Sequence, residues 1–203
     1  MVEFLLPDMS KGFTLLELII VIGILAILGT VSVLVLNPAQ LFAQARDTTR
    51  IQDLQTLNSA LGLYVSSVSS PDLDGTTSMC STLCYVGANL GLSAGCQGAG
   101  VTARHGTKTA TYLAARTVNG TGWVPVAFSD ISGGAPLATL PVDPTNDTTY
   151  FYSYVCDNAA KTYELNGNLE STRYTSGADD REGPDGGNNA AIYEIGTAPG
   201  LAL

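Results

Sequence analysis

A single acid at the edge of a long apolar segment is the residue of this sequence with the clearest chemical consequence. Glu17 precedes a run from Leu18 to Leu36 in which every side chain is apolar except at four positions, Gly23, Gly29, Thr30 and Ser32. As a helix, this run would extend about 28 Å, close to the thickness of a bilayer's hydrocarbon core. A charge at the centre of a membrane helix costs about 2.5 kcal/mol or more, and less near the interface, so Glu17 needs a partner.

The residues around Glu17 resemble the N-terminus of type IV pilins and type II secretion pseudopilins. The resemblance rests on a short leader ending in Lys11-Gly12, then Phe13-Thr14-Leu15-Leu16-Glu17 and the apolar segment. It implies that a prepilin peptidase cuts between Gly12 and Phe13 and N-methylates Phe13. The missing side chain of Gly12 would leave the scissile bond accessible. The resemblance also implies that Glu17 pairs with the amino terminus of a neighbouring subunit during assembly, which would give the carboxylate its partner.

Two other interpretations of this segment are a signal anchor with an accidental glutamate and a secretory signal peptide. The second fits poorly, because a signal peptide has an apolar region of about 7–15 residues followed by small residues. Here the run is longer, and Asn37-Pro38-Ala39-Gln40 is a weak cleavage site. We therefore expect a cleaved leader at residues 1–12 and a transmembrane or filament-core helix at residues 13–36.

The remainder of the chain predicts an α+β fold in which a second helix packs on a small antiparallel sheet. Apolar residues recur at three- and four-residue steps across residues 38–69, the pattern of an amphipathic helix, and Asn37-Pro38 predicts a restart or kink before it. We expect a connecting loop region at residues 70–111, with a short helix near 80–90. Residues 112–203 would form the sheet head, with an acidic loop near its end.

Two hairpins are predicted within the head. The first joins residues 112–118 to 123–128 through the turn dipeptide Asn119-Gly120, with Pro125 limiting the second strand. The second joins residues 149–156 to 161–166. This half of the chain also resembles the major pseudopilins, through Leu140-Pro141-Val142-Asp143-Pro144, the tyrosine-rich strand and Tyr163-Glu164-Leu165. That resemblance implies an antiparallel sheet of three or four strands packed on the helix.

Aromatic and charged side chains of these elements have more than one interpretation. Trp123 and the tyrosines of residues 150–154 would form either the core of the sheet or a face that stacks on carbohydrate. Four charged residues of the second helix would contact each other or a neighbouring subunit, and we expect them to be solvated pairs of small energetic effect. They are Arg46, Asp47, Arg50 and Asp53.

Four cysteines lie beyond the apolar segment and predict two disulfides in an oxidising compartment. Three connectivities are possible for Cys80, Cys84, Cys96 and Cys156. The one that we prefer pairs Cys80 with Cys84 and Cys96 with Cys156. A zinc site is the rival interpretation, with His105 as its only available histidine.

The segment of residues 179–189 is a candidate calcium site. It combines four acids with three glycines and two asparagines, and calcium prefers several oxygen ligands from a loop that can bend. The resemblance to major pseudopilins, which bind calcium in a C-terminal loop, adds weight to Asp179, Asp180 and Asp185 as ligands. The plainer interpretation is a solvated acidic loop, so Ca²⁺ is the one cofactor that the sequence suggests.

The sequence gives little support to catalysis. The only histidine, His105, stands in the polar loop Arg104-His105-Gly106-Thr107 with no acid beside it in sequence. No Gly-x-Ser-x-Gly, phosphate-binding or His-Glu-x-x-His motif occurs. The matches to the glycosylation pattern at residues 119–121 and 146–148 are weak signals. We therefore expect a protein that is not an enzyme.

Charge and processing together predict a structural role. The net charge is −9, and from residue 129 onward eleven acids face three bases, a surface that repels nucleic acid. The expected function is a pilus-like filament subunit that polymerises with its own copies through the N-terminal helix. Its partners would be prepilin peptidase and an inner-membrane assembly platform, and its final location an extracellular or periplasmic filament. The alternatives are a pseudopilin of type II secretion and a membrane-anchored extracellular binding module that never polymerises.

Overall fold

A computed structural model describes residues 12–75, 79–92, 94–98 and 104–203. The chain divides into two compact units, one that ends at Leu41 and one that runs from Phe42 to Leu203. Each is described by itself. Of the leader expected at residues 1–12, only Gly12 belongs to the described residues, and Lys11 lies outside them.

The helix α1 (Leu15–Leu36) begins and ends at residues suited to these positions. At its start, the hydroxyl of Thr14 accepts a hydrogen bond from the backbone N–H of Glu17 at 3.2 Å, as a helix N-cap does. At its end, Asn37 adopts the left-handed conformation with φ 40°, and Pro38 offers no backbone N–H. The interruption predicted at Asn37-Pro38 is therefore present, and α2 (Pro38–Ser67) starts with proline in its first turn.

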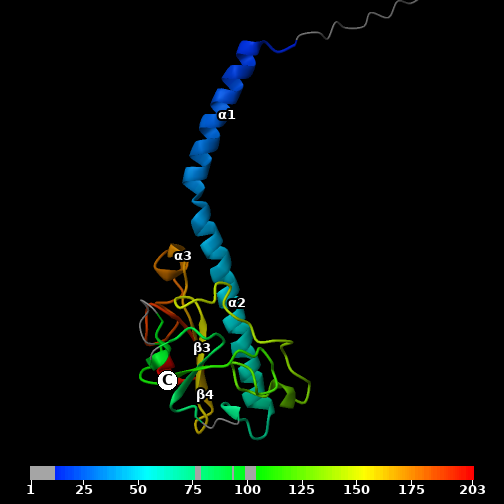
Figure 1. The fold of residues 1–203 in the computed structure, drawn as a ribbon, viewed down its shortest axis with the longest axis vertical. Helices are drawn as coiled ribbons and strands as arrows, with labels where there is room; N and C mark the ends of the chain where they lie inside the picture. Colours follow the sequence, from blue (N-terminus) through cyan, green and yellow to red (C-terminus); the bar gives the residue numbers. More distant parts are fainter. Residues whose placement is uncertain (1–11, 76–78, 93, 99–103) are drawn as a thin grey trace, which may run out of the picture. The chain divides into compact units, whose positions relative to one another are not determined.

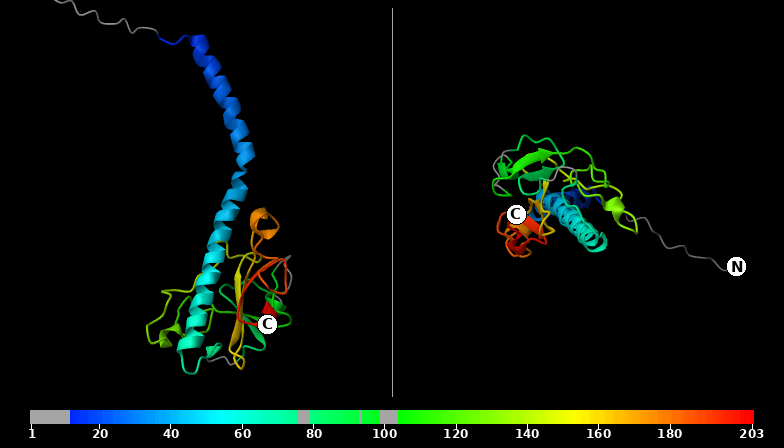
Figure 2. Two further views of the ribbon diagram at one scale, coloured as in Figure 1. Left: turned by 180° about the vertical axis from the view of Figure 1, so that it is seen from behind. Right: turned by 90° about the horizontal axis from the view of Figure 1, so that it is seen from below.

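The second unit is an α+β structure, as the sequence predicts. Its sheet contains β1 (Leu83–Val86), β2 (Thr109–Tyr112), β3 (Tyr152–Asp157), β4 (Thr162–Gly167) and β5 (Tyr193–Gly196), in the order β2-β1-β3-β4-β5. Figures 1 and 2 show α2 running along one side of β3 and β4. The remaining helical turns are η2 (Ala94–Cys96), η3 (Phe128–Asp130), α3 (Thr172–Thr175) and η4 (Pro199–Leu201).

The sheet confirms one predicted hairpin and corrects the expected topology. β3 and β4 pair antiparallel through six residue pairs, from Tyr152 opposite Gly167 to Asp157 opposite Thr162. However, the sheet has five strands rather than three or four, and β1 pairs with β2 in parallel. Two parallel strands must start at the same end of the sheet. The long connection between β1 and β2 is sufficient to carry the chain from the end of β1 back to the end of the sheet where β1 starts.

Alternation along the strands divides the sheet into two faces with different chemistry. The face toward α2 is apolar and packs against the leucines of the helix. Its strand residues include Tyr85, Tyr152, Tyr154, Tyr163 and Leu165, and the facing helix residues include Leu54, Leu57, Leu61 and Tyr64. The opposite face carries a small apolar cluster with Cys84, Val86, Phe151 and Val155. Ser153, Glu164 and Asn166 alternate with the residues of the α2 face and are buried on this opposite face.

Two predicted elements, one in the connecting region of residues 70–111 and one in the head, are absent from the described structure, and the connecting region contains β1 and β2 rather than loops alone. The prediction of a short helix near 80–90 is wrong, because residues 83–86 form the strand β1. The prediction of a hairpin across Asn119-Gly120 is also wrong. Between the two predicted strands, the described structure has only an isolated β-bridge that pairs Asn119 with Ala127. Trp123 instead directs its backbone N–H to Ala115 and its indole N–H to Pro141. Trp123 is completely buried, so the core interpretation of this residue is correct.

Candidate functional site

The processing and assembly residues predicted from the sequence lie at the start of α1. A Cβ atom built on Gly12 would have no heavy atom within 4 Å apart from those of its two chain neighbours. The next residue, Phe13, is 83% exposed. The peptide bond between them is therefore open to an enzyme. Glu17 stands in the first turn of α1, one turn beyond Thr14, with its side chain exposed.

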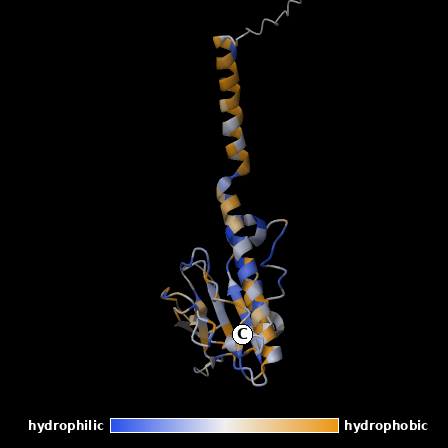
Figure 3. Ribbon diagram, turned by 90° about the vertical axis from the view of Figure 1, so that its right-hand side faces the viewer, coloured by the Kyte–Doolittle hydropathy of each residue, from blue (hydrophilic) through white to orange (hydrophobic). Residues whose placement is uncertain are grey.

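The body of α1 is long and apolar enough to cross a membrane. The window from Leu15 to Val33 has a mean hydropathy of 2.6, and none of it is buried within the described chain. Figure 3 shows this apolar character along α1, in contrast to the mixed character of α2. The two hydroxyls of the helix, on Thr30 and Ser32, donate to carbonyls of the preceding turn at 2.8 Å, so they add no unsatisfied donor to the apolar surface.

Glu17 is the one acid in α1, and no cation of the described chain lies within ion-pair distance of it. An exposed helix of this composition requires cover from lipid or from other helices. Glu17 also requires a cation from outside the described part of the molecule once the helix is covered. The described residues therefore present an apolar surface with one charge that they do not themselves satisfy.

A buried ion cluster joins α2 to the loops of the head, and it corrects the expectation of solvated pairs. Arg50 is fully buried and binds both carboxylate oxygens of Asp143, at 2.8 and 3.0 Å, in a bidentate arrangement. It also donates to Asp47 at 2.9 Å and to Glu170 at 3.1 Å. Burial works against the cation, but the hydrogen bonds from Arg50 to these carboxylates outweigh it and raise the pKa of Arg50.

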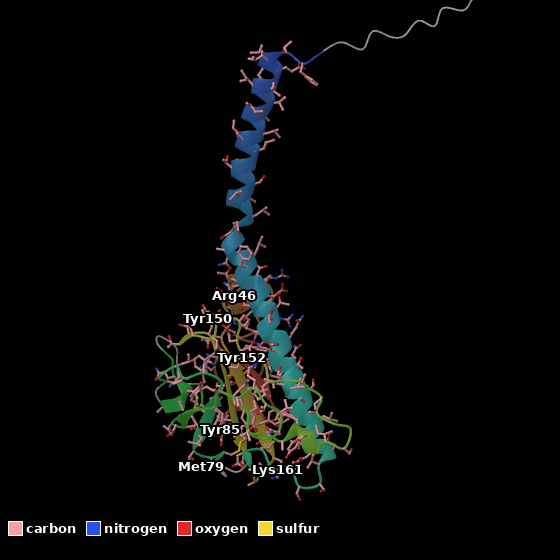
Figure 4. The ribbon with its side chains drawn as sticks, turned by 45° about the vertical axis from the view of Figure 1, so that its right-hand side comes forward. Arg46, Met79, Tyr85, Tyr150, Tyr152 and Lys161 are labelled. Atoms are coloured by element: carbon pink, nitrogen blue, oxygen red, sulfur yellow. A yellow bond between two sulfur atoms is a disulfide. The ribbon has the colours of Figure 1, made fainter. Side chains whose placement is uncertain are left out.

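The remaining members of the cluster fix the backbone that surrounds Arg50. Asp47 accepts the backbone N–H groups of Glu170 and Ser171, at 2.9 and 2.7 Å. Arg46 pairs with Glu170, and Tyr150 stacks under Arg50 with 4.6 Å from guanidinium carbon to ring centroid. Figure 4 labels Arg46 and Tyr150 at this end of the head. The helix is thus held to the head by a network that no local pattern indicates.

Asp53, the fourth charged residue considered on α2, makes a separate contact. Its carboxylate accepts a hydrogen bond from the hydroxyl of Tyr152 at 2.9 Å. Partial burial of Asp53 raises the pKa of this carboxyl. Asp53 therefore joins α2 to β3 beside the ion cluster.

All four cysteines form disulfides, but the preferred pairing was wrong. Cys80 bonds Cys156 with 4.9 Å between Cα atoms, and Cys84 bonds Cys96 with 6.1 Å. The faces of the sheet explain this choice. Cys80 and Cys156 belong to the core beside α2, whereas Cys84 and Cys96 belong to the apolar cluster of the opposite face. The sheet separates the two pairs, and the formed bonds leave no thiol among these cysteines for zinc.

The structure does not bring the three predicted calcium ligands together. Asp179 pairs with Arg173, and Asp180 accepts backbone N–H groups two and three residues further on, at 3.0 and 3.1 Å. Asp185 accepts the N–H groups of Gly187 and Glu194, at 2.8 and 2.7 Å. Within the described ranges, no group of three or more histidine, cysteine, aspartate or glutamate side chains is placed to hold a metal ion.

Two other acids of the C-terminal region are buried, and sequence reasoning missed both. Glu182 accepts the backbone N–H of Leu169 at 2.9 Å, and Glu194 accepts that of Asn189 at 2.8 Å. Burial raises the pKa of Glu182 to about 7 and that of Glu194 to about 8, with nearby carboxylates contributing. The acidic segment is thus partly packed into the head.

His105 has an acid beside it in space, although none is near in sequence. Its Nε2 lies 2.8 Å from the hydroxyl of Ser153, and its Nδ1 lies 3.4 Å from Glu164 Oε1. Hydroxyl, imidazole and carboxylate in this order resemble the groups used for nucleophilic catalysis. However, Ser153 is fully buried in the middle of β3, so a substrate does not reach its hydroxyl. Burial also lowers the pKa of His105, which favours the neutral ring.

Comparison with known proteins locates one family signature. The family model of the prokaryotic N-terminal methylation motif matches residues 8–33, which include Gly12, Phe13, Glu17 and most of α1. This match agrees with the N-terminus of type IV pilins and pseudopilins. Neither the curated proteins nor the solved structures contain a match to this chain.

Proposed function

We propose that this protein is a structural subunit of a type IV pilus-like filament. Prepilin peptidase removes residues 1–12 and methylates the new amino terminus at Phe13, while α1 holds the chain in the inner membrane. The assembly platform then extracts α1 from the membrane and packs it against the same helix of other subunits. The head remains on the outside of the filament, in the periplasm or beyond the cell.

The observation that carries this proposal is the unsatisfied surface of α1. The motif at residues 8–33 coincides with an apolar helix that the described chain leaves uncovered and whose one acid lacks a cation. Bundling with other subunits would bury this surface, and the amino group of a neighbouring Phe13 would neutralise Glu17. A membrane-anchored module that never polymerises would not need a charge at this position.

The test is to replace Glu17 by alanine and to measure filaments sheared from the native cells. We expect the Glu17→Ala chain to be cleaved and to remain in the membrane, with filament recovery lost. Ser32→Ala is the matched control, since it alters the same helix without removing a charge, and it should assemble normally. Filaments of Glu17→Ala at the yield of the unmodified protein would overturn the proposal.

A further inference from the structure

Arg104 is a buried cation without a carboxylate partner among the described residues. It is 3% exposed, and its terminal nitrogens donate to the carbonyls of Phe151 at 2.6 Å and Thr149 at 3.3 Å, and to the side-chain oxygen of Asn168. Its guanidinium carbon lies 3.5 Å from the ring centroid of Phe151. All these groups are neutral, and burial lowers the pKa of Arg104 to about 9. A charge buried without a counter-ion is unfavourable.

Arg104 lines a cavity whose described walls are basic and amide-bearing. The cavity has a volume of about 550 Å³, within the range of small-ligand sites. It is lined by Ser81, Arg104, His105, Gly106, Thr107, Lys108, Asn188, Asn189, Ala202 and Leu203. None of these residues has an acidic side chain, although the whole chain has twice as many acids as bases. The lining is therefore basic and amide-bearing, although the carboxylates of Glu164 and Glu194 accept the backbone N–H groups of its residues Leu203 and Asn189.

Several donors around the cavity keep hydrogen-bonding capacity. The Nε of Arg104 is buried and has no hydrogen-bond partner in the described part of the chain, whereas the Nδ1 of His105 faces Glu164 Oε1 at 3.4 Å. The amine of Lys108 donates to the carbonyls of Ser81 and Cys80, at 3.1 and 3.4 Å, and an ammonium group has three protons to donate. Glu164 lies against His105 and accepts the side-chain N–H of Asn166 and the backbone N–H of Leu203, and it forms no ion pair with Arg104 among the described residues.

We propose that this cavity binds an oxyanion, the carboxylate or phosphate group of a small ligand, between Arg104 and Lys108. Oxyanions suit both residues, because guanidinium and ammonium groups form their shortest and strongest hydrogen bonds with carboxylate and phosphate oxygens. The bound anion supplies the counter-ion that Arg104 lacks. The head thereby gains a ligand site that is independent of α1 and of filament assembly.

His105 offers a direct assay, since it is the only histidine in the sequence and lines the cavity. Its ring resonances are followed by NMR in the full chain held in detergent micelles, at constant pH and ionic strength. Inorganic phosphate and glucuronate are titrated separately. We expect a saturable shift of the His105 signals with at least one of them. Saturation by phosphate alone identifies a phosphate site, by glucuronate alone a sugar-acid site, and by both a site for the shared oxyanion.

Variants connect any such shift to the cavity. Lys108→Gln should weaken binding about tenfold or more, while Lys108→Arg should preserve most of it. Lys161→Gln is the matched control, because it removes the same charge from an amine that donates to Pro71 and Asn158 outside the cavity. No saturable shift with either anion would overturn the proposal. Equal affinities in Lys108→Gln and Lys161→Gln would overturn it as well.

Discussion

Removing Arg50 should destabilise the head far more than removing any exposed charge. Arg50→Met deletes a bidentate pair with Asp143 and a bond to Asp47, and it leaves both carboxylates completely buried. Loss of one partner from a buried pair costs about 3–5 kcal/mol. The two carboxylates keep backbone N–H donors, at Thr145 and Asn146 for Asp143 and at Glu170 and Ser171 for Asp47. We therefore expect the lower end of this range, about 3 kcal/mol.

The measurement is urea unfolding of the full chain in detergent, followed by fluorescence. Trp123 is the only tryptophan and is fully buried, so its emission reports the head. For a domain of this size, a loss of about 3 kcal/mol corresponds to a melting point lower by roughly 6–12 °C. Arg46→Met is the control, because Arg46 is 38% exposed and, among the described residues, forms an ion pair with Glu170 alone. If Arg50→Met were no less stable than Arg46→Met, the ion cluster would not hold α2 to the head as argued.

Two further predictions concern the head. Peptide mapping without reduction should recover Cys80 linked to Cys156 and Cys84 linked to Cys96, and a Cys80–Cys84 peptide would contradict the separation of these pairs by the sheet. Glu194 has a folded pKa of about 8, raised above the ordinary glutamate value by burial. Its contribution to stability is complete below about pH 4.5 and is lost as the pH rises through 8. The melting point should therefore fall between pH 5 and pH 9, and less steeply in Glu194→Gln; equal slopes would contradict this assignment.

Features set by neighbouring residues could be predicted from the sequence. The apolar run predicts α1, Asn37-Pro38 predicts the break because proline suits the first turn of a new helix, and the tyrosine-rich strand followed by a turn predicts the β3–β4 hairpin. Each of these depends on local backbone preference or periodicity. The same local pattern failed at Asn119-Gly120, because burial of Trp123 and its hydrogen bonds to Ala115 and Pro141 displaced the expected strand pairing.

Features that join distant residues could not be predicted in this way. Arg50 and Asp143 are 93 positions apart, and nothing near either residue indicates the other. His105 meets Ser153 and Glu164 only because β3 and β4 present them on the same face of the sheet. Even cysteine pairing depends on which face each strand residue occupies, and that follows from strand register rather than from spacing.

The most direct test of the central claim is the intact mass and N-terminal sequence of protein sheared from the cell surface. The account predicts filaments made of a chain that begins at Phe13 and carries one additional methyl group, with all four cysteines oxidised. A chain that retains residues 1–12 and is recovered only from the membrane would contradict both the processing and the assembly.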